Sequence, residues 1–180
     1  MKRLIKCTFA LLFLLFTTQA TAAPMTYNFS QSGFTGGGTI TGSFTGDDLD
    51  MNGALNSFVG EITNYSLTYS GGSIVGMFTH SFAEFGQLVY VIGTPFLGDD
   101  PILGTEGVAS GPLFGPPDLF TYESGLGPQG TLGGTVINNA TGAFDTTQQL
   151  VVVTAVPEPA TLALFGLGLA GLGFARKRKT

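Results

Sequence analysis

Three oxygen-bearing side chains are spaced at alternate positions in the run Asp48-Leu49-Asp50-Met51-Asn52-Gly53. This spacing is typical of the start of a calcium-binding loop, in which the oxygens converge on a hard cation. Gly53 would allow the sharp turn that such a loop needs, and the backbone carbonyl of Ala54 would occupy the seventh loop position. The pattern therefore predicts a Ca²⁺ site whose first ligands are Asp48, Asp50, Asn52 and Ala54.

The far end of this loop departs from the calcium-binding pattern. The twelfth position usually carries a bidentate Glu, but here it is Val59. Glu61 lies two residues later and would close the site only with a different loop geometry. No helical pattern flanks the loop, which argues against a true EF-hand. The alternative is a plain acidic hairpin turn, because Asn-Gly, here Asn52-Gly53, is a favoured type I′ pair.

Histidine, cysteine and serine patterns give little support to catalysis. His80 is the only histidine, and no Gly-x-Ser-x-Gly elbow surrounds a serine that could serve a Ser-His-Asp triad. The run Phe78-Thr79-His80-Ser81-Phe82 is interpreted as the end of a strand with His80 exposed. A zinc site would need three or four His or Cys ligands, and the chain has one of each. A glycosidase needs a pair of carboxylates, but with twelve acidic residues many pairs are possible, so no single pair indicates one. The protein is therefore not expected to be an enzyme.

Charged residues are divided sharply along the chain. All seven Lys and Arg residues lie at 2–6 and 176–179, whereas all twelve Asp and Glu residues lie between Asp47 and Glu158. The segment from Ala23 to Pro159 thus has a formal charge of −12, with His80 as its one candidate cation. Such a surface repels nucleic acid and anionic lipid, favours solubility and attracts divalent cations. Nucleic acid is excluded as a partner.

The segment between the basic ends has the composition of a β protein. Its roughly 137 residues suffice for one domain with a core, and they include 24 Gly, 11 Phe and 5 Tyr. Large apolar residues argue against disorder, while frequent Gly and Pro without 3.6-residue periodicity argue against helix. Short alternating runs between turn signals predict about seven to nine strands in an antiparallel β-sandwich or jelly roll.

The candidate strands are short runs with alternating or continuous apolar residues. They are Tyr27–Phe29, Thr39–Phe44, Tyr65–Tyr69, Ile74–Thr79, Gln87–Ile92, Thr131–Ile137 and Ala143–Val153. Turns are predicted at Gly71-Gly72, Gly98-Asp99-Asp100-Pro101 and Asn138-Asn139. The Pro- and Gly-rich stretch Thr94–Gly130 is predicted to form long surface loops, with one edge strand near Leu119–Tyr122.

The N-terminal residues have the three parts of a secretory signal peptide. These parts are a basic region at Lys2, Arg3 and Lys6, an apolar region at Phe9–Phe16, and a small-x-small cleavage site at Ala20 and Ala22. Cleavage is predicted after Ala22. Because Cys7 is the single cysteine and lies in the removed segment, the mature protein would hold no disulfide.

A second targeting segment forms the C-terminal end. Pro157-Glu158-Pro159 follows Val156 and resists helix, because proline fixes φ and lacks an amide hydrogen. The uncharged run Ala160–Ala175 predicts a transmembrane helix of about 24 Å, a little short for a hydrocarbon core of about 30 Å. A basic stop-transfer signal follows, which should stay cytoplasmic and reach the headgroups by snorkelling. It consists of Arg176, Lys177, Arg178 and Lys179. The alternative is an ordinary single-pass tail anchor.

Residues 156–180, VPEPATLALFGLGLAGLGFARKRKT, resemble a PEP-CTERM sorting signal of Gram-negative bacteria. The resemblance covers this segment alone. It implies that an exosortase, a membrane-embedded cysteine transpeptidase, cuts near Pro157-Glu158-Pro159. The protein would then pass from an inner-membrane precursor to the cell surface or the exopolysaccharide matrix.

These observations together predict three consecutive parts. Residues 1–22 would be the signal peptide, residues 23–155 an extracellular β domain, and residues 156–180 the sorting signal. The expected partners are the Sec translocon, signal peptidase, exosortase and exopolysaccharide. A structural or adhesive role in the matrix is the first expectation, a calcium- or glycan-binding module is the alternative, and an extracellular hydrolase is the distant third.

Overall fold

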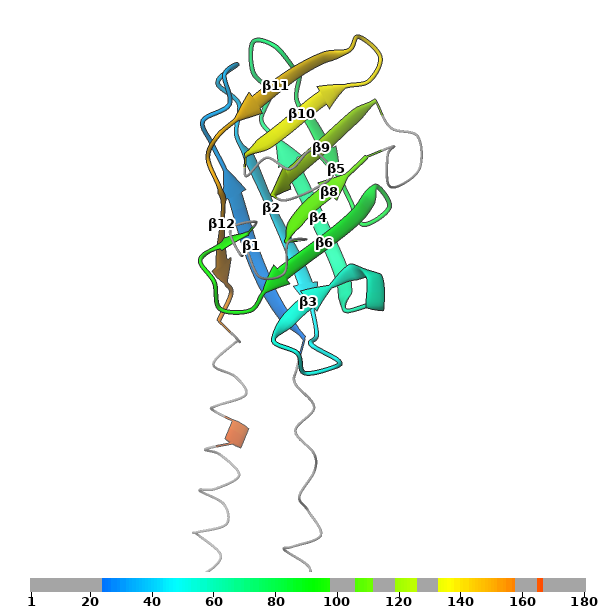
Figure 1. The fold of residues 1–180 in the computed structure, drawn as a ribbon, viewed down its shortest axis with the longest axis vertical. Coiled ribbons are helices and arrows are strands. Elements are labelled where there is room, and N and C mark those ends of the chain that lie inside the picture. The colour runs from blue at the N-terminus through cyan, green and yellow to red at the C-terminus, as the bar shows by residue number, and fades with distance from the viewer. Residues whose placement is uncertain (1–23, 98–105, 112–118, 126–132, 158–164, 167–180) are drawn as a thin grey trace, which may run out of the picture.

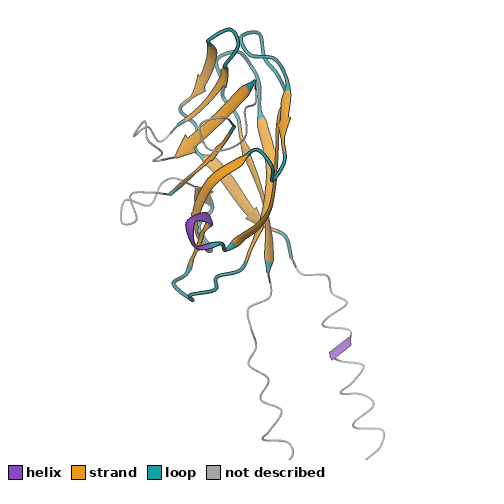
Figure 2. Cartoon of the chain, turned by 90° about the vertical axis from the view of Figure 1, so that its right-hand side faces the viewer, coloured by secondary structure: helices purple, strands orange, loops and turns teal. Residues whose placement is uncertain are grey.

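The computed structural model describes residues 24–97, 106–111, 119–125, 133–157 and 165–166. Within these residues, twelve strands form two six-stranded antiparallel sheets that pack against each other (Figures 1 and 2). The described part of the chain is therefore all-β, and its architecture is that of a β-sandwich.

Each sheet is built from strands that are not all consecutive in the sequence. Sheet A has the order β5 (Phe78–His80), β4 (Ile62–Tyr69), β2 (Ile40–Gly46), β1 (Met25–Gln31), β12 (Val151–Ala155) and β7 (Phe96–Leu97). Sheet B has the order β11 (Ala143–Thr147), β10 (Gly134–Asn138), β9 (Phe120–Gly125), β8 (Gly107–Ser110), β6 (Phe85–Val91) and β3 (Ala54–Asn56). One 3₁₀ turn, η1 (Ser57–Val59), follows β3.

The alternating patterns seen in the sequence place the core side chains as predicted. In β2, Ile40 and Phe44 are both buried and lie on one face. In β4, Tyr65, Leu67 and Tyr69 are all buried in the same way. Because successive side chains of a strand point to opposite faces, this two-residue period is what a sheet with one covered face requires.

Aromatic rings join the two sheets across the core. Tyr27 of sheet A stacks on Phe44 at 5.1 Å and meets Tyr90 of sheet B edge-on at 5.2 Å. Nearer the other end, Phe78 stacks on Phe120 of the opposite sheet at 4.7 Å. Burying each large apolar side chain contributes about 1.5–3 kcal/mol, so these contacts account for much of the adhesion between the sheets.

The five tyrosines are buried together with their hydroxyl groups, and each hydroxyl donates a hydrogen bond. The acceptors are Met25 Sδ for Tyr27, Ser110 Oγ for Tyr65, Asp145 Oδ2 for Tyr69, the Thr94 carbonyl for Tyr90 and Gln31 Oε1 for Tyr122. Burial of a hydroxyl without a partner would cost free energy, so these bonds are part of what makes a tyrosine-rich core stable.

The first and last strands lie side by side in the middle of sheet A. Tyr27 of β1 pairs with Ala155 of β12, and the Val156 amide donates to the Thr26 carbonyl at 2.8 Å. The chain therefore enters β1 and leaves β12 at the same end of the sandwich, the lower end in Figure 1.

Prediction and structure disagree in the stretch Thr94–Gly130. The described part of this stretch holds β7, β8 and β9, which takes the total beyond the predicted seven to nine strands. The strand predicted near Leu119–Tyr122 is confirmed as β9 (Phe120–Gly125), but its predicted edge position is wrong, because β9 lies inside sheet B between β10 and β8. Glycine caused the error: a Cβ on Gly107 would lie 2.6 Å from the Ser124 carbonyl, so here glycine permits close strand pairing rather than a turn.

Two further strand predictions need correction. In the predicted strand Ile74–Thr79, residues 74–77 form a loop whose Val75 reaches the core, and β5 begins only at Phe78. The predicted strand Ala143–Val153 is two strands, β11 in sheet B and β12 in sheet A. The chain crosses between the sheets at residues 148–150. The predicted turn at Asn138-Asn139 is confirmed by a 2.8 Å bond from the Gly142 amide to the Asn138 carbonyl.

Candidate functional site

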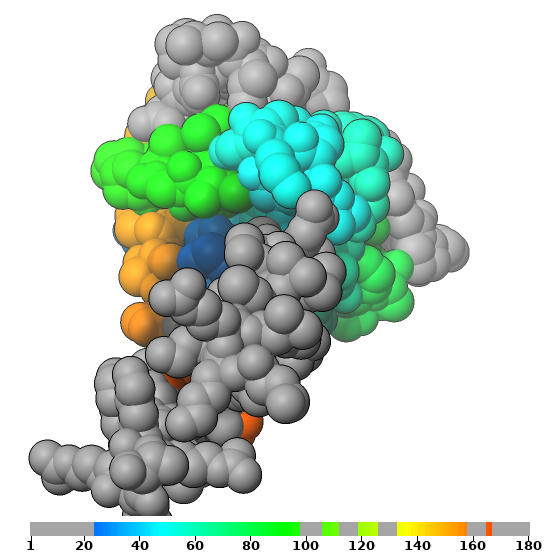
Figure 3. Space-filling model, turned by 90° about the horizontal axis from the view of Figure 1, so that it is seen from below, coloured from blue at the N-terminus to red at the C-terminus, as the bar shows by residue number. Residues whose placement is uncertain are grey.

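The acidic loop, defined here as residues 47–61, lies at the lower end of the sandwich in Figure 1. It starts where a register shift between Thr45 and Gly46 ends the regular pairing of β2 with β4. The Asp47 amide then donates to the Glu61 carbonyl at 3.0 Å, which closes the loop at its base. Seen from below in Figure 3, the cyan surface of this segment lies beside the green surface that contains β6, with which β3 pairs.

Glu61 is brought back to the start of the loop by the 3₁₀ turn η1. The Asn56 side chain caps η1 by accepting from the Phe58 amide, and Gly60 ends it with a left-handed φ of 83°. An L-residue with a side chain rarely adopts this φ, so glycine suits the reversal. The turn supplies the different geometry that a glutamate two residues beyond the twelfth loop position would need.

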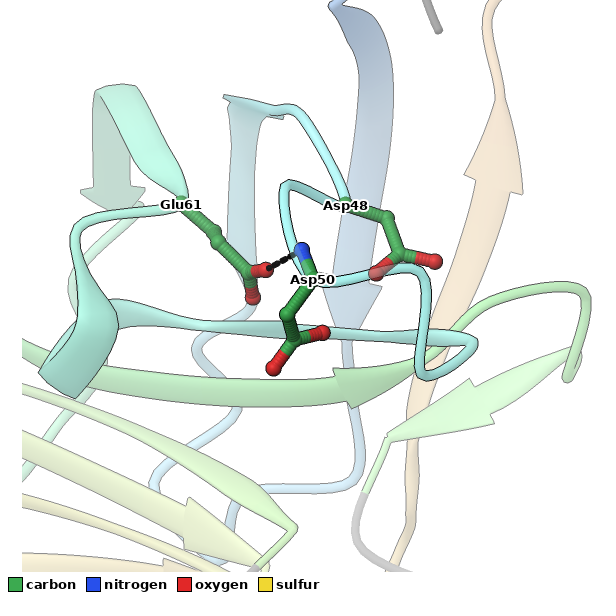
Figure 4. A group of neighbouring side chains, drawn as sticks. All are labelled: Asp48, Asp50 and Glu61. Atoms are coloured by element: carbon green, nitrogen blue, oxygen red, sulfur yellow. Dashed lines mark hydrogen bonds between the residues drawn. The ribbon is translucent and has the colours of Figure 1, made fainter.

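Glu61 is fully buried and holds the loop from within. One carboxylate oxygen accepts the Leu49 and Asp50 amides at 2.9 and 3.4 Å, and the other accepts the Asn56 amide at 2.8 Å. Figure 4 shows the bond from the Asp50 amide to this carboxylate. These donors offset the cost of burying a charge in a segment without Lys or Arg.

The two aspartates accept hydrogen bonds from the tip of the loop. Asp48 accepts the Asn52 and Gly53 amides at 3.0 and 2.9 Å, one on each oxygen. Asp50 accepts the Asn52 amide at 3.1 Å and the Asn52 side-chain amide at 2.9 Å. Asp50 is exposed and Asp48 is partly buried, so the carboxylates form a series from solvent to interior that ends at Glu61.

The three carboxylates converge. One oxygen from each of Asp48, Asp50 and Glu61 lies within 4.8 Å of the other two (Figure 4). Oxygens bound to a single Ca²⁺ at about 2.3–2.6 Å can be up to about 5 Å apart, so this spacing is compatible with one shared cation. Their charges also repel one another at this distance, and a divalent cation would relieve that repulsion.

The remaining predicted ligands have other contacts. The side-chain oxygen of Asn52 accepts the Ala54 amide at 2.8 Å, while its nitrogen faces Asp50. Asn52 would therefore have to turn its amide to offer its oxygen to a cation. Ala54 begins β3 and pairs with Val91 of β6.

The alternative prediction of a type I′ hairpin at Asn52-Gly53 is wrong. A type I′ turn needs positive φ at both central residues. Within the described chain, the one non-glycine residue with positive φ is Met51, at 59°, and it precedes the Asn-Gly pair. The carboxylate bonds of Asp48 and Asp50 favour this left-handed residue by drawing the amides of the loop tip inward.

The prediction that His80 is exposed is also wrong. His80 has no exposed surface, and a 2.8 Å hydrogen bond joins its Nδ1 to Ser110 Oγ of β8. Ser110 is equally buried and accepts a 3.4 Å hydrogen bond from the Tyr65 hydroxyl. The alternation Phe78-Thr79-His80 could have indicated an inward His80, since Phe78 is buried and Thr79 is exposed. Its partner could not have been found, because Ser110 lies in a stretch interpreted as loop.

The start of the sorting segment is described, and most of it is not. Val156 and Pro157 follow β12 directly and are exposed. Of the predicted helix Ala160–Ala175, only Phe165 and Gly166 are described, and both are helical. Among the residues that the structure describes, no helix is long and apolar enough to span a membrane. The other predicted sorting and processing residues lie outside the described ranges; they are Ala20, Ala22, Glu158, Pro159, Arg176, Lys177, Arg178 and Lys179.

Comparison with known protein families gives one match. Residues 155–179 match the family model of the PEP-CTERM protein-sorting motif, which confirms the resemblance seen in the sequence. The motif implies exosortase-dependent sorting of a membrane-anchored precursor to the cell surface. Searches of curated proteins and of solved structures gave no match.

Proposed function

We propose that this PEP-CTERM-tagged chain is a non-enzymatic surface protein whose β-sandwich has a structural or adhesive role in an exopolysaccharide matrix. The observation that carries the proposal is that the sorting motif follows the last strand of the β-sandwich directly. β12 ends at Ala155, and the matched motif spans residues 155–179. The Sec translocon and signal peptidase would act on residues 1–22, and exosortase on Pro157-Glu158-Pro159.

The buried polar groups support a non-enzymatic role. The His80–Ser110 pair is the pairing that a serine hydrolase would use, but neither residue has exposed surface. A substrate would need to reach the serine oxygen through the packed sheets. The pair fits a structural role, in which each polar group satisfies the other inside the core.

Cell fractionation tests the delivery step. Loss of the host's exosortase should leave the intact precursor in the inner membrane instead of releasing the body to the surface. Replacing Glu158 by Ala should have the same effect, because it removes the acidic group of the motif. Asp50→Ala is the matched control, since it removes one exposed carboxylate outside the motif. Unchanged release in the exosortase-deficient strain would leave only the tail-anchor interpretation.

Calcium binding by the acidic loop is the second candidate function. The convergence of the Asp48, Asp50 and Glu61 oxygens within 4.8 Å favours it. The backbone amides already satisfy these carboxylates, so the loop can keep its shape without an ion and bind one reversibly. Oxygen ligands in an irregular loop suit Ca²⁺ better than Mg²⁺, which demands near-ideal octahedral geometry.

Thermal unfolding in the presence of each ion tests this candidate. Ligand binding to the folded state stabilises it by about 2.7 kcal/mol at a hundredfold excess over Kd, which should raise Tm by about 5 °C or more. Ca²⁺ should exceed Mg²⁺ in this effect, and Asp50→Asn should remove the difference. Glu123→Gln is the control, because it removes an acidic charge from β9, outside the loop. Equal shifts with both ions would mean that cations only screen the −12 surface.

A further inference from the structure

A groove of about 520 Å³ opens on the outer face of sheet B, over β9, β10 and β11. It lies on the face opposite the core: Val136 and Asp145 point inward and are buried, while their strand neighbours line the groove. This position is distinct from the acidic loop, which lies beside β3 at the opposite edge of sheet B.

Strand register arranges the lining in two rows. Glu123, Thr135 and Thr146 are directly paired across the three strands. Ile137 and Phe144 form the second row, two residues further along. Neighbouring strands lie about 4.8 Å apart, so the first row extends for about 10 Å, enough for a short stretch of sugar rings. One row is polar and the other is apolar.

The apolar row offers a surface for stacking. Phe144 is 62 % exposed and lies on the outward face of β11, the edge strand of sheet B. A pyranose ring has an apolar face of C–H bonds and a rim of hydroxyl groups, and aromatic rings bind the former through their electron-rich face. Ile137, paired with Phe144, widens this apolar strip.

The polar row offers hydrogen-bonding side chains that no residue in the described ranges engages. Glu123 is partly buried, burial raises the pKa of its carboxyl group, and no residue in the described ranges donates a hydrogen bond to it. Sugar hydroxyls are donors of the kind that such a carboxylate lacks, while the Thr135 and Thr146 hydroxyls can both donate and accept. Gln148 adds an amide at the rim.

Charge limits the ligand. The groove contains one carboxylate and no Lys or Arg, and the whole segment from Ala23 to Pro159 is devoid of these cations. An anionic polymer would therefore be repelled and would find no counter-charge in the groove. An apolar ligand would cover the partly buried Glu123 carboxylate and supply no hydrogen-bond donor, and no residue in the described ranges supplies one either.

We propose that this groove binds a neutral glycan, with a sugar ring stacked on Phe144 and its hydroxyls bonded to Glu123, Thr135 and Thr146. This inference rests on the proposed surface role, because it names the class of matrix molecule that the domain contacts. Ligand sites are usually mostly apolar, and a small number of polar groups around the apolar surface orient the ligand.

Calorimetric titration of the full chain tests the groove. The chain is held in micelles of a detergent without a sugar headgroup, so that detergent does not compete. The probes are the neutral hexasaccharides cellohexaose, maltohexaose, mannohexaose and xylohexaose, with hexagalacturonate as the anionic comparison. At least one neutral probe should bind with a Kd in the micromolar to millimolar range, and hexagalacturonate should not.

Matched variants locate the binding. Phe144→Ala should weaken binding at least tenfold, and Thr135→Val, which keeps the side-chain shape, should weaken it several-fold. Phe58→Ala should leave it unchanged, since Phe58 is a similarly exposed phenylalanine in η1. Phe144 is exposed, so its replacement should leave the circular dichroism spectrum unaltered.

Three outcomes would overturn the inference: no binding by any neutral probe, equal binding of the anionic probe, or undiminished affinity in Phe144→Ala. Surface delivery is measured separately by fractionation. A correctly delivered protein that binds no neutral probe would remove the groove and leave the delivery proposal intact, whereas a mislocalised protein that still binds would do the reverse.

Discussion

The acidic loop lies at the lower end of the sandwich in Figure 1 and β11 at the upper end. Each contains a carboxylate that is almost fully buried: Glu61 of the loop is 0 % exposed, and Asp145 of β11 is 1 % exposed. Neither has a Lys or Arg to pair with, because the body contains none. Glu61 accepts three backbone amides from residues at most twelve positions away. Asp145 accepts the Gly36 amide on both oxygens at 3.0 Å and the Tyr69 hydroxyl at 2.9 Å.

The difference lies in what each carboxylate connects. The partners of Asp145 are 109 and 76 residues away in sequence, so this side chain ties β11 of sheet B to sheet A. The partners of Glu61 all belong to its own loop, and two more carboxylates lie beside it. Asp145 therefore stabilises the tertiary structure, whereas Glu61 shapes one loop and leaves acidic groups available to a cation.

Replacing Asp145 by Ala should produce the largest effect. The change leaves the partly buried Gly36 amide and the buried Tyr69 hydroxyl without their acceptor, at about 1–3 kcal/mol each, so the free energy of unfolding should fall by about 3 kcal/mol. Urea denaturation measures this fall. Asp145→Asn, which keeps one acceptor oxygen, should lose less than half as much. If Asp145→Ala lost under 1 kcal/mol, the proposed tie between the sheets would be absent.

Replacing Glu61 by Gln should have a smaller and more local effect. The amide keeps one acceptor oxygen but loses the charge that strengthens the three hydrogen bonds, so a loss of about 1–2 kcal/mol is expected. Hydrogen exchange should accelerate most at the Leu49, Asp50 and Asn56 amides, because these donate to Glu61. Equal acceleration at the Gly36 amide would show that both carboxylates stabilise the whole fold alike.

These two carboxylates also show how far the sequence could lead. The convergence of Asp48, Asp50 and Glu61 rests on neighbours within one loop, so a spacing motif could bring it into view. The role of Asp145 rests on contacts with Gly36 and Tyr69, which no local pattern connects. The same division holds for the strands: β1, β2 and β4 were predictable from alternation, because one face of each is covered by the core.

Glycine-rich segments were the hardest to predict. Gly107 allows β8 to approach β9 closely, and the two strands lie inside sheet B although the same glycines resemble turn signals. Ser110 was missed with them, and so was its bond to His80. Glycine's lack of a side chain supports both turns and close strand contacts, and only the tertiary partner decides between them.

The burial of Tyr69 and its contact with Asp145 should make the free energy of unfolding depend on pH in the alkaline range. Burial raises the pKa of Tyr69 above its ordinary value of 10, and the hydrogen bond and charge of Asp145 raise it further. A tyrosine with a raised folded-state pKa contributes its full stability below about pH 10 and loses it as the pH rises above that value. Burial raises the pKa values of Tyr65 and Tyr122 as well, so the three together should lower the free energy of unfolding by about 4 kcal/mol per pH unit above pH 10.

Tyr69→Phe isolates the contribution of one tyrosine to this pH dependence of the free energy of unfolding. Its slope above pH 10 should be shallower than that of the natural protein by about 1.4 kcal/mol per pH unit, because one group fewer releases a proton on unfolding. Glu61→Gln should leave the alkaline slope unchanged, since no tyrosine bonds to the acidic loop. Denaturant titrations between pH 9 and about 11.5 provide the measurement. An unaltered slope in Tyr69→Phe would mean that this hydroxyl ionises equally in the folded and unfolded protein, so that its folded-state pKa is not raised.

The smallest predicted effect lies at Met51, at the tip of the acidic loop. Its φ of 59° is left-handed and its side chain is 81 % exposed, so the residue carries backbone strain without any packing in return. Asn adopts this region more readily than other L-residues, so Met51→Asn should raise the free energy of unfolding by about 0.5 kcal/mol.

The same variant tests whether the acidic loop binds a cation or has only a structural role. If the acidic loop is a cation site, the gain should persist with Ca²⁺ present, because a loop already relaxed at its tip still offers Asp48, Asp50 and Glu61. If instead those carboxylates only stabilise the left-handed turn, Met51→Asn should stabilise the ion-free protein, and added Ca²⁺ should not raise the free energy of unfolding further. Denaturant titrations of Met51→Asn with and without Ca²⁺ separate these results, and Thr154→Asn on β12 is the control for the Ca²⁺ response of an asparagine added outside the loop.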